Sequence, residues 1–535
     1  MRSRAFTLIS LSIILGQATL PNKIPLLAAD FFQPVLPARS VQFIIHRGVR
    51  QAAPENTLPA IQLAIDQGFE WVEVDVRLTK DGHHVIFHDR RLNNKSNGSG
   101  RVKERMLQEI KALDGGSWFA KRFAGTKILT LEELLRYAKK KINLYLDCKE
   151  VDPESLVQAI RAAQMEEQVV VFSSSKMLGQ INQSGLGKIP LIPLYRMYGE
   201  NYLDTLIQQF RPAAIEFEAG EITPALIGRC HKAGVRVLAK DLGGKDRTKL
   251  WNRLIDLGVD WIMTDVGEGV LSAYTQRLIP RRPIKIVAQR GVGLLAPENT
   301  RKAYERAINL GLDFIEVDVR TSRDGRLVLF HDRTLESKSS GAGPLEHLDL
   351  EELVQLDFGS WFGQPYEKEK IMTFREVLEL AKGKIQIYAN SREADPKQLV
   401  RELRQEDMAD QVVVLADKKS FATLRAIQPE LRVMPRLRSR EALKELRNLR
   451  PYAVEAAWTL VSPELIRESH ESGIKVFANA TGRDEKTGGV GEYVQAIEWG
   501  IDAIQTTYPT RIFRALEIWK LRQEGRSKDS LRPTY

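Results

Sequence analysis

A long internal repeat constrains this chain more than any other feature. Four short motifs near the N-terminus recur in the same order, each of them 243 residues further on. The first set reads IIHRG (Ile44–Gly48), APENT (Ala53–Thr57), WVEVDVR (Trp71–Arg77) and VIFHD (Val85–Asp89). The second set reads VAQRG (Val287–Gly291), APENT (Ala296–Thr300), FIEVDVR (Phe314–Arg320) and VLFHD (Val328–Asp332). A period of this length is that of a whole domain and not of a solenoid repeat or a propeller blade. The 535 residues are therefore expected to fold as two similar domains.

The N-terminal segment is typical of a secretory signal peptide. Arg2 and Arg4 precede an apolar run from Ala5 to Leu15, and small residues follow that run. We expect residues 1–29 to be the signal peptide of a secreted or periplasmic protein, whereas an uncleaved segment would anchor the chain in a membrane. The two repeats are then expected at residues 41–277 and 283–521, joined by a short connector that brings them into contact. Residues 522–535 form a polar tail.

Within each copy, short apolar runs rich in β-branched residues alternate with amphipathic stretches. The strands expected in the first copy are Phe43–Ile45, Trp71–Val76, Ile142–Leu146, Val169–Phe172, Ala213–Phe217, Val235–Ala239 and Trp261–Thr264. The helices expected between them are Thr57–Gln67, Leu131–Lys140, Pro153–Ala163, Tyr202–Phe210, Pro224–Ala233 and Leu250–Leu257. Apolar strands that alternate with helices indicate a parallel sheet covered on both faces. With repeats of this size, the sequence predicts an α/β protein of two tandem TIM-type (β/α)8 barrels, with an open doubly wound sheet as the alternative.

Charge and cysteine content narrow the class of partner. The formal net charge is +10 and is not concentrated in one run, which is typical of a solvated surface, and an anionic substrate or an anionic membrane surface is the alternative. The sequence shows no motif typical of nucleic-acid binding. The two cysteines, Cys148 and Cys230, do not make a disulfide framework, and we expect both to be buried free thiols. A small-molecule substrate, with peripheral membrane contact as a further option, is therefore predicted.

Three carboxylates of the first copy form a candidate metal site. Glu73 and Asp75 lie two residues apart on an expected strand, so that both side chains point to the same face. Two buried carboxylates need a compensating positive charge, which a hard cation such as Ca²⁺ or Mg²⁺ supplies. Asp147, in NLYLDCK (Asn143–Lys149), offers a third acidic ligand. Lys149 faces the same way as Asp147 and could bind an anion.

A turn after Asp75 is expected to bring a histidine back beside it. Asp81-Gly82 is a strong signal for a two-residue hairpin loop. Folding about this turn pairs His88 with Asp75, which places an imidazole beside the carboxylates for proton transfer. His83 and His84, at the turn itself, are expected to face solvent.

The motif His46-Arg47-Gly48 closes the first expected strand, at the rim where barrels of this type keep their active sites. Arg47 can bind phosphate oxygens through two parallel hydrogen bonds, and Gly48 lets the backbone turn close to a ligand. Glu55 could be a further polar contact or a group near the metal. Asn56 or Thr57 is expected to cap the helix that follows.

This combination resembles the glycerophosphodiester phosphodiesterase (GDPD) family. The resemblance rests on HRG, PENT, ExD, the KDG turn, HD, the acidic-x-Lys strand and the closing pair Thr264-Asp265, which together span nearly all of the first copy. It implies a TIM-type barrel that uses a divalent cation to hydrolyse glycerophosphodiesters to glycerol 3-phosphate and an alcohol. It also implies roles for the site residues: metal ligands at Glu73, Asp75 and Asp147, phosphate contacts at Arg47 and Lys149, and an acid/base pair at His46 and His88.

One departure bears on the substrate. Asp147 stands where many members of the family have Glu, and the related spider-venom sphingomyelinase D enzymes also have Asp-x-Lys there. A phospholipase D-like enzyme acting on lysolipids is therefore the second hypothesis, and a non-catalytic protein that binds phosphodiesters is the third. In the expected mechanism, one histidine takes a proton from the attacking hydroxyl and the other protonates the leaving alcohol. The attacking hydroxyl is either that of the glycerol itself, which gives a cyclic phosphate, or water.

The second copy has lost several of these residues. It keeps Arg290, Glu298, Glu316, Asp318 and His331. It carries Gln289 for His46, Asn390 for Asp147, Arg392 for Lys149 and Thr507 for Asp265. Glutamine does not shuttle a proton near neutral pH, and asparagine brings no charge to a cation. We therefore expect a degenerate domain with a binding, lid or stability role, and weak or altered catalysis by His331 is the competing interpretation.

Overall fold

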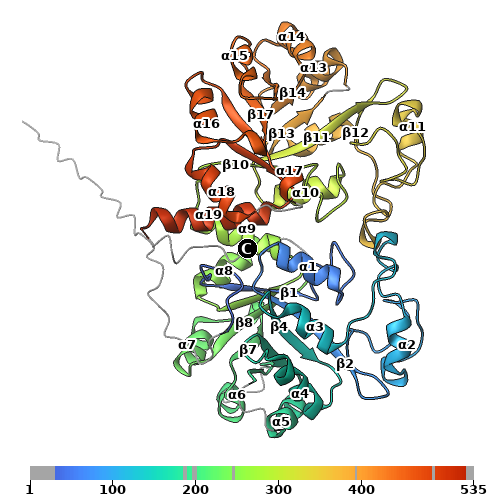
Figure 1. Cartoon of the computed structure of the whole chain (residues 1–535), viewed down its shortest axis with the longest axis vertical. Coiled ribbons are helices and arrows are strands. Elements are labelled where there is room, and N and C mark those ends of the chain that lie inside the picture. Colours follow the sequence, from blue (N-terminus) through green and yellow to red (C-terminus); the bar gives the residue numbers. More distant parts are fainter. Residues whose placement is uncertain are drawn as a thin grey trace, which may run out of the picture.

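The computed structural model describes residues 31–184, 189–195, 202–243, 247–391, 394–484 and 489–525. The expected signal peptide and most of the polar tail lie outside these residues. Two α/β barrels lie one against the other, the first drawn in blue to green and the second in yellow to red (Figure 1). Within the described ranges, no helix combines the length and the apolar character that a membrane span requires.

The first barrel is a ring of parallel strands. Their order is β6 (Leu191–Ile192), β5 (Val169–Phe172), β4 (Asn143–Cys148), β2 (Trp71–Leu78), β1 (Gln42–His46), β9 (Trp261–Thr264), β8 (Arg236–Asp241) and β7 (Ala214–Glu218). A parallel bridge between Leu194 and Glu216 joins the two ends. The helices are α1 (Leu58–Asp66), α2 (Leu107–Ala112), α3 (Leu131–Ala138), α4 (Pro153–Ala163), α5 (Ser175–Gln183), α6 (Tyr202–Phe210), α7 (Pro224–Lys232), α8 (Thr248–Leu257) and α9 (Gly267–Leu278), with short 3-10 helices at Val102–Glu104, Lys121–Phe123 and Ala219–Glu221.

The second barrel repeats this arrangement. Its strand order is β15 (Arg432–Met434), β14 (Val412–Leu415), β13 (Gln386–Asn390), β11 (Phe314–Thr321), β10 (Lys285–Ala288), β19 (Ala503–Thr506), β18 (Lys475–Asn479), β17 (Ala453–Ala457) and β16 (Arg436–Leu437). Only Pro435 separates β15 from β16, so the two ends of the sheet meet. The helices are α10 (Arg301–Asn309), α11 (Leu350–Leu353), α12 (Phe374–Ala381), α13 (Pro396–Gln405), α14 (Lys418–Ile427), α15 (Ala442–Arg447), α16 (Pro463–His470), α17 (Thr481–Asp484), α18 (Val490–Glu498) and α19 (Pro509–Gln523), with 3-10 helices at Leu345–His347, Gln364–Tyr366 and Trp458–Leu460. The prediction of two tandem TIM-type barrels is confirmed.

Large apolar side chains fill the inside of the first barrel below the site. Trp71 and Trp261, at the N-terminal ends of β2 and β9, lie 4.9 Å apart between ring centroids. Phe31, from the segment that precedes β1, packs against both of them, with centroid distances of 5.0 and 5.6 Å. The barrel is therefore a packed core and not a pore.

Local sequence signals account for several elements. Thr130 and Glu133 form the reciprocal capping box at the start of α3, and Thr373 and Glu376 do the same at α12. Cys148 packs among the apolar residues between β4 and the helices, and Cys148 and Cys230 are both buried free thiols, as expected.

The hairpin after β2 differs from the prediction in its register. Strand β3 (His84–Ile86) pairs with β2 so that Val76 faces Ile86, and the amide of Thr79 donates to the carbonyl of His83 at 2.9 Å. The loop is therefore longer than two residues. Within it, the Thr79 hydroxyl donates to the Asp81 carboxylate and accepts from the His83 amide. As a result Phe87 pairs with Asp75, and the expected pairing of His88 with Asp75 is wrong by one residue.

The expectation that both turn histidines face solvent is half right. His83 is exposed, whereas His84 is 2% exposed and its Nε2 accepts a hydrogen bond from the Asp152 amide at 3.2 Å. Burial lowers the pKa of His84. The difference follows from the register, because His84 is the first paired residue of β3, whereas His83 still belongs to the loop.

The two barrels contact each other through helices, as expected from the short connector. Helix α9 of the first barrel lies beside α19 of the second (Figure 1). Arg306 on α10 donates from Nε to the Glu268 carboxylate on α9 at 2.8 Å, and Glu268 is 2% exposed. The Ser272 hydroxyl on α9 donates to the Leu310 carbonyl at 2.7 Å. Polar side chains inside the contact thus fix how the barrels meet.

Candidate active site

The three predicted carboxylates come together at the C-terminal end of the first barrel. Glu73 and Asp75 alternate with Trp71 on β2 and therefore face the barrel axis, and the register of β4 sets Asp147 directly beside Asp75. Carboxylate oxygens of Glu73, Asp75 and Asp147 all lie within 4.8 Å of one another, and this is the one such group in the described part of the chain. Burial and the neighbouring carboxylates raise the pKa of Glu73 well above its usual value.

The surroundings of these carboxylates fit a cation. Burial, together with the charge of Asp75, raises the pKa of Asp147 to about 6, although the Lys149 ammonium opposes the rise. Oδ1 of Asp75 is buried and accepts no hydrogen bond from the described residues, and Lys149 Nζ lies 3.4 Å from it. A buried carboxylate oxygen without a donor is costly unless something positive binds it. Oxygen ligands alone are the donor set that Ca²⁺ and Mg²⁺ prefer.

Asn56 holds Asp75 in place, which the sequence did not reveal. Its Nδ2 donates to Asp75 Oδ2 at 2.8 Å, and its Oδ1 accepts the Asp75 amide at 3.0 Å. The expected capping role is therefore wrong for Asn56. Thr57 occupies the N-cap position of α1, but its hydroxyl donates to the Pro54 carbonyl at 2.5 Å instead of capping the helix. Asn56 adopts a left-handed φ of 58°, a conformation that asparagine tolerates better than most residues.

The turn after β1 aims Arg47 at the same carboxylates. Arg47 has a φ of 58°, and its amide donates to Glu73 Oε2 at 2.9 Å. Its guanidinium bonds Glu55 from Nη1 at 3.1 Å and lies 3.1 Å from Asp75 Oδ2 through Nε. Gly48 follows with a φ of 76°, and a Cβ there would lie 2.7 Å from the Ala60 backbone carbon. Only glycine fits this position, which explains the HRG motif.

Glu55 serves Arg47 and lies outside the carboxylate group. It accepts from Arg47, and its other oxygen lies 3.8 Å from Lys95 Nζ. Sequence reasoning did not single out Lys95, whose ammonium also lies 3.7 Å from the centroid of the Trp118 ring. Glu55 therefore orients a candidate phosphate contact, and the structure does not bring it to the metal position.

His46 is fixed by a partner on the neighbouring strand of the ring. Its Nδ1 lies 2.8 Å from Asp265 Oδ1, and Asp265 also accepts the Gly243 amide at 3.0 Å. Because a carboxylate only accepts, Nδ1 carries the proton and Nε2 is left with a lone pair. This Nε2 lies 3.9 Å from Glu73 Oε2, and burial lowers the pKa of His46 in spite of the Asp265 hydrogen bond. Asp265 directly follows β9, which was the available signal for its role.

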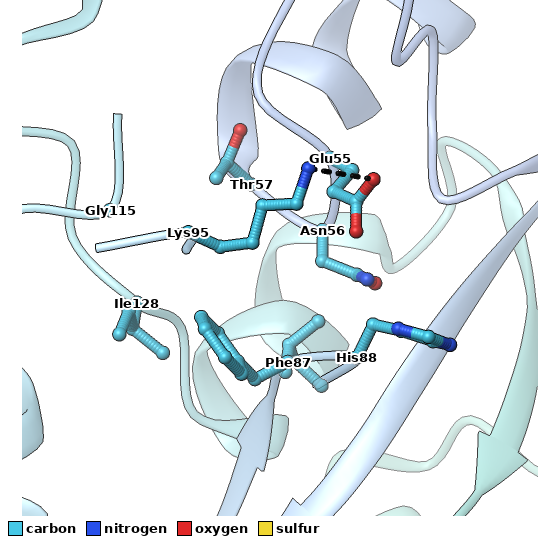
Figure 2. Close-up of a pocket in the computed structure, with 9 residues that line it drawn as sticks. Glu55, Asn56, Thr57, Phe87, His88, Lys95, Gly115 and Ile128 are labelled. Atoms are coloured by element: carbon cyan, nitrogen blue, oxygen red, sulfur yellow. Dashed lines mark ion pairs between the residues drawn. The ribbon is translucent and has the colours of Figure 1, made fainter. Parts of the chain in front are cut away.

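His88 lies two residues after β3 and is more open to solvent than His46. Its side chain is 33% exposed, and its Nδ1 lies 2.7 Å from Asp89 Oδ1. It lines a small pocket together with Glu55, Asn56 and Lys95, and the side chains of Asn56 and His88 extend to the same side of it (Figure 2). His88 thus reaches the neighbourhood of Asp75 through Asn56, although the hairpin register does not pair the two.

The second barrel keeps the framework and changes the chemistry. Arg290 repeats the contacts of Arg47: its amide donates to Glu316 at 2.9 Å, and its guanidinium bonds Glu298 at 3.0 Å and lies 3.1 Å from Asp318. Asn390 sits beside Asp318 on the paired strand, where Asp147 sits in the first barrel. Its Nδ2 donates to Asp318 Oδ1 at 3.1 Å, and its side chain also bonds Glu316. The position of Arg392 lies outside the described residues.

Comparison with known proteins identifies both halves. The sequence model of the Glycerophosphoryl diester phosphodiesterase family matches residues 46–268 and again residues 290–511. A glycerophosphodiester phosphodiesterase of Caldanaerobacter subterraneus subsp. tengcongensis is 33% identical over 243 residues, which cover 43% of this chain and 96% of that protein. One of Bacillus subtilis is 30% identical over 162 residues, which cover 29% of this chain and 55% of that protein.

Among solved structures, a glycerophosphodiester phosphodiesterase from Agrobacterium tumefaciens aligns with 42% of this chain and 96% of its own at 28% identity, with a TM-score of 0.39. The identification rests on the two matches to the family and on the relatives. The chain is therefore an enzyme of the glycerophosphodiester phosphodiesterase class, and it belongs to the glycerophosphoryl diester phosphodiesterase family with one copy of the family's domain in each barrel.

Proposed function

We propose that the first barrel hydrolyses glycerophosphodiesters to glycerol 3-phosphate and an alcohol, with a divalent cation held by Glu73, Asp75 and Asp147. The observation that supports this most is the convergence of these three carboxylates, together with an Asp75 oxygen that accepts no hydrogen bond from the described residues. The second barrel places an amide, Asn390, at the third position, and it is proposed not to hydrolyse these substrates.

The cation, Ca²⁺ or Mg²⁺, would neutralise charge on the phosphate as the transition state forms. Arg47 and Lys149 flank the carboxylates and would contact the remaining phosphate oxygens, since both side chains are partly open to the site. Glu55 and Asp75 hold the Arg47 guanidinium from two sides, which fixes its direction before substrate arrives.

His46 has the geometry of a general base. Asp265 fixes the proton on Nδ1, so Nε2 can accept a proton from the attacking hydroxyl, which belongs either to the substrate glycerol or to water. Asp265 also stabilises the imidazolium that results. His88, paired with Asp89 and partly exposed, is placed to give a proton to the leaving alcohol. The two histidines, each paired with an aspartate, would thus supply the two proton transfers.

The test is release of glycerol 3-phosphate from glycerophosphocholine by the full-length protein. We expect release with Ca²⁺ or Mg²⁺, loss of release in excess chelator, and recovery on adding the cation back. His46→Ala and His88→Ala should each abolish release, whereas His331→Ala, the change in the second barrel that matches His88→Ala, should leave it intact. No release with either cation would overturn the proposal. Loss of release in His331→Ala alone would move the reaction to the second barrel.

A further inference from the structure

The mouth of the second barrel contains a cavity of about 270 Å³. Its polar lining comes from Gln289, Arg290, Glu298, Thr481, Thr507 and Tyr508. This volume corresponds to about nine water molecules at about 30 Å³ each. The cavity lies at the C-terminal ends of the strands, where barrels of this kind bind their ligands.

Two of the lining residues replace the proton-transfer pair of the first barrel. In the first barrel Ile45 pairs with Thr264, and His46 and Asp265 follow these residues. In the second barrel Ala288 pairs with Thr506, and Gln289 and Thr507 follow in the same places. An ionisable pair has thus become an amide and a hydroxyl, and both line the cavity.

Thr507, which lines this cavity, and Gln505, two residues before it, carry polar atoms that have no hydrogen-bond partner among the described residues. Oγ1 of Thr507 is buried and bonds to none of the described residues. Gln505 is 4% exposed, and its Oε1 is likewise without a hydrogen bond among them. Ala503 belongs to the barrel's apolar interior, so the alternation along β19 turns Gln505 and Thr507 toward the axis as well. Buried polar atoms in this state have hydrogen-bonding capacity left for a molecule in the cavity.

The charges of the mouth are already compensated by one another. Arg290 lies between Glu298 and Asp318, at 3.0 and 3.1 Å. Lys338 lies 2.8 Å from Glu298 and 3.4 Å from Asp332. The Asn390 amide bonds the carboxylates that would otherwise need a cation. Among the described residues, neither an anion nor a cation finds an uncompensated partner there, whereas neutral hydroxyl groups find both donors and acceptors.

We propose that the mouth of the second barrel binds a small neutral polyol through its hydroxyl groups, without a cation and without hydrolysing it. Thr507 and Gln289 are the residues that would hydrogen-bond the polyol. The second barrel would then be a binding site for an uncharged alcohol joined to an enzyme, and its occupancy would not depend on metal.

The experiment is saturation-transfer NMR on the full-length protein in excess chelator, with glycerol and myo-inositol as probes and inorganic phosphate as the charged comparator. We expect saturation transfer from the protein to both polyols, and we expect that phosphate does not displace them. Thr507→Val, which removes only the hydroxyl, should weaken polyol binding about five-fold, in line with the loss of one net hydrogen bond. Gln289→Leu, at the open rim, tests the same site without touching the buried strand.

Two controls separate this proposal from the one for the first barrel. His46→Ala should leave polyol binding unchanged, and Thr507→Val should leave the release of glycerol 3-phosphate unchanged. Polyol binding that survives Thr507→Val and Gln289→Leu but disappears in His46→Ala would place it in the first barrel and overturn the inference. Displacement of the polyols by phosphate, or no transfer to either polyol, would overturn it as well.

Discussion

Asp147 and Asn390 occupy the same place in the two barrels. They differ only in that Asp147 has a second carboxylate oxygen where Asn390 has an amide nitrogen. Asp147→Asn therefore converts the first site to the composition of the second with almost no change in volume. We expect this variant to lose cation affinity and to lose at least about 10²-fold in the rate of glycerol 3-phosphate release, since one anionic ligand in three disappears. Calorimetric titration with Ca²⁺ and the release assay measure the two effects.

The matched control is Asn390→Asp in the second barrel. It restores the third carboxylate, and we expect a new cation site there without restored hydrolysis, because Gln289 still stands in place of His46. Undiminished cation binding in Asp147→Asn would show that Asp147 is not a ligand.

Asp265 acts on the reaction only through His46, and its removal should therefore change turnover more than binding. For Asp265→Asn we expect kcat to fall about 10²- to 10⁴-fold, the range seen when a histidine loses the carboxylate that fixes its tautomer, with KM and cation affinity nearly unchanged. Steady-state kinetics over a range of glycerophosphocholine concentrations separates the two constants. An equal loss in cation affinity would indicate a structural role instead.

Each barrel contains a loop in which several backbone amides donate hydrogen bonds to one aspartate. Asp357 accepts hydrogen bonds from the amides of Gly359, Ser360 and Lys368 at 2.7, 2.8 and 2.7 Å, and from the Ser360 hydroxyl. Burial would raise the pKa of Asp357, but these donors outweigh it and hold the pKa at about 2. Because this lies below the unfolded value of about 3.9, the stabilisation is fully present above about pH 4 and disappears as the pH falls toward 2.

For Asp357→Ala we expect the free energy of unfolding to fall by about 1–3 kcal/mol at pH 7, because the part-buried Gly359 amide and the more exposed donors of Ser360 and Lys368 lose a common acceptor. The difference in the free energy of unfolding between this variant and the unaltered protein should shrink between pH 4 and pH 3. Urea unfolding at several pH values measures it. Asp114, which accepts the amides of Gly116, Ser117 and Gly125, is the matched position in the first barrel and should behave alike. A penalty that does not change with pH would contradict this account.

For the whole molecule, buried charges at the contact between the barrels decide how the two halves unfold. Arg306 donates to Glu268, whose side chain is 3% exposed, and to the Leu295 carbonyl within its own barrel. A second group joins Arg39, from the segment before β1, to Glu517 on α19 and to Glu70 of the first barrel. These pairs connect residues far apart in sequence, so each barrel satisfies buried charges of the other.

Arg306→Ala leaves Glu268 buried without its cation, which costs about 3–5 kcal/mol in comparable pairs. We expect thermal unfolding to begin at a lower temperature and to separate into two transitions, measured by differential scanning calorimetry. The double variant Arg306→Met with Glu268→Leu removes both charges and should recover most of the loss. Unaltered unfolding in Arg306→Ala would show that the pair does not couple the barrels.

Much of the fold followed from the sequence because its signals are local or repeated. The 243-residue period gave two domains, and the alternation of apolar strands with amphipathic helices gave the parallel barrels. Helix α4 and strands β5 and β9 lie at the predicted residues. The carboxylates also followed from local rules, since Glu73 and Asp75 share a face of one strand by their spacing alone. Short elements without strong periodicity, such as β6 and α5, were not predicted.

The sequence by itself determined that the chain is duplicated, that each half is a barrel and that the second half has Gln289, Asn390 and Thr507 where the first has His46, Asp147 and Asp265. Only the tertiary structure decided that Asn56 holds Asp75, that His46 is paired with Asp265, and that the His88 hairpin is shifted by one residue. It also decided that Asn390 bonds the carboxylates of the second barrel and that Gln289 and Thr507 share a cavity. The physical reason is that spacing along one strand fixes which side chains share a face, whereas contacts between distant strands depend on register, loop length and ring closure, which are settled only when the whole barrel packs.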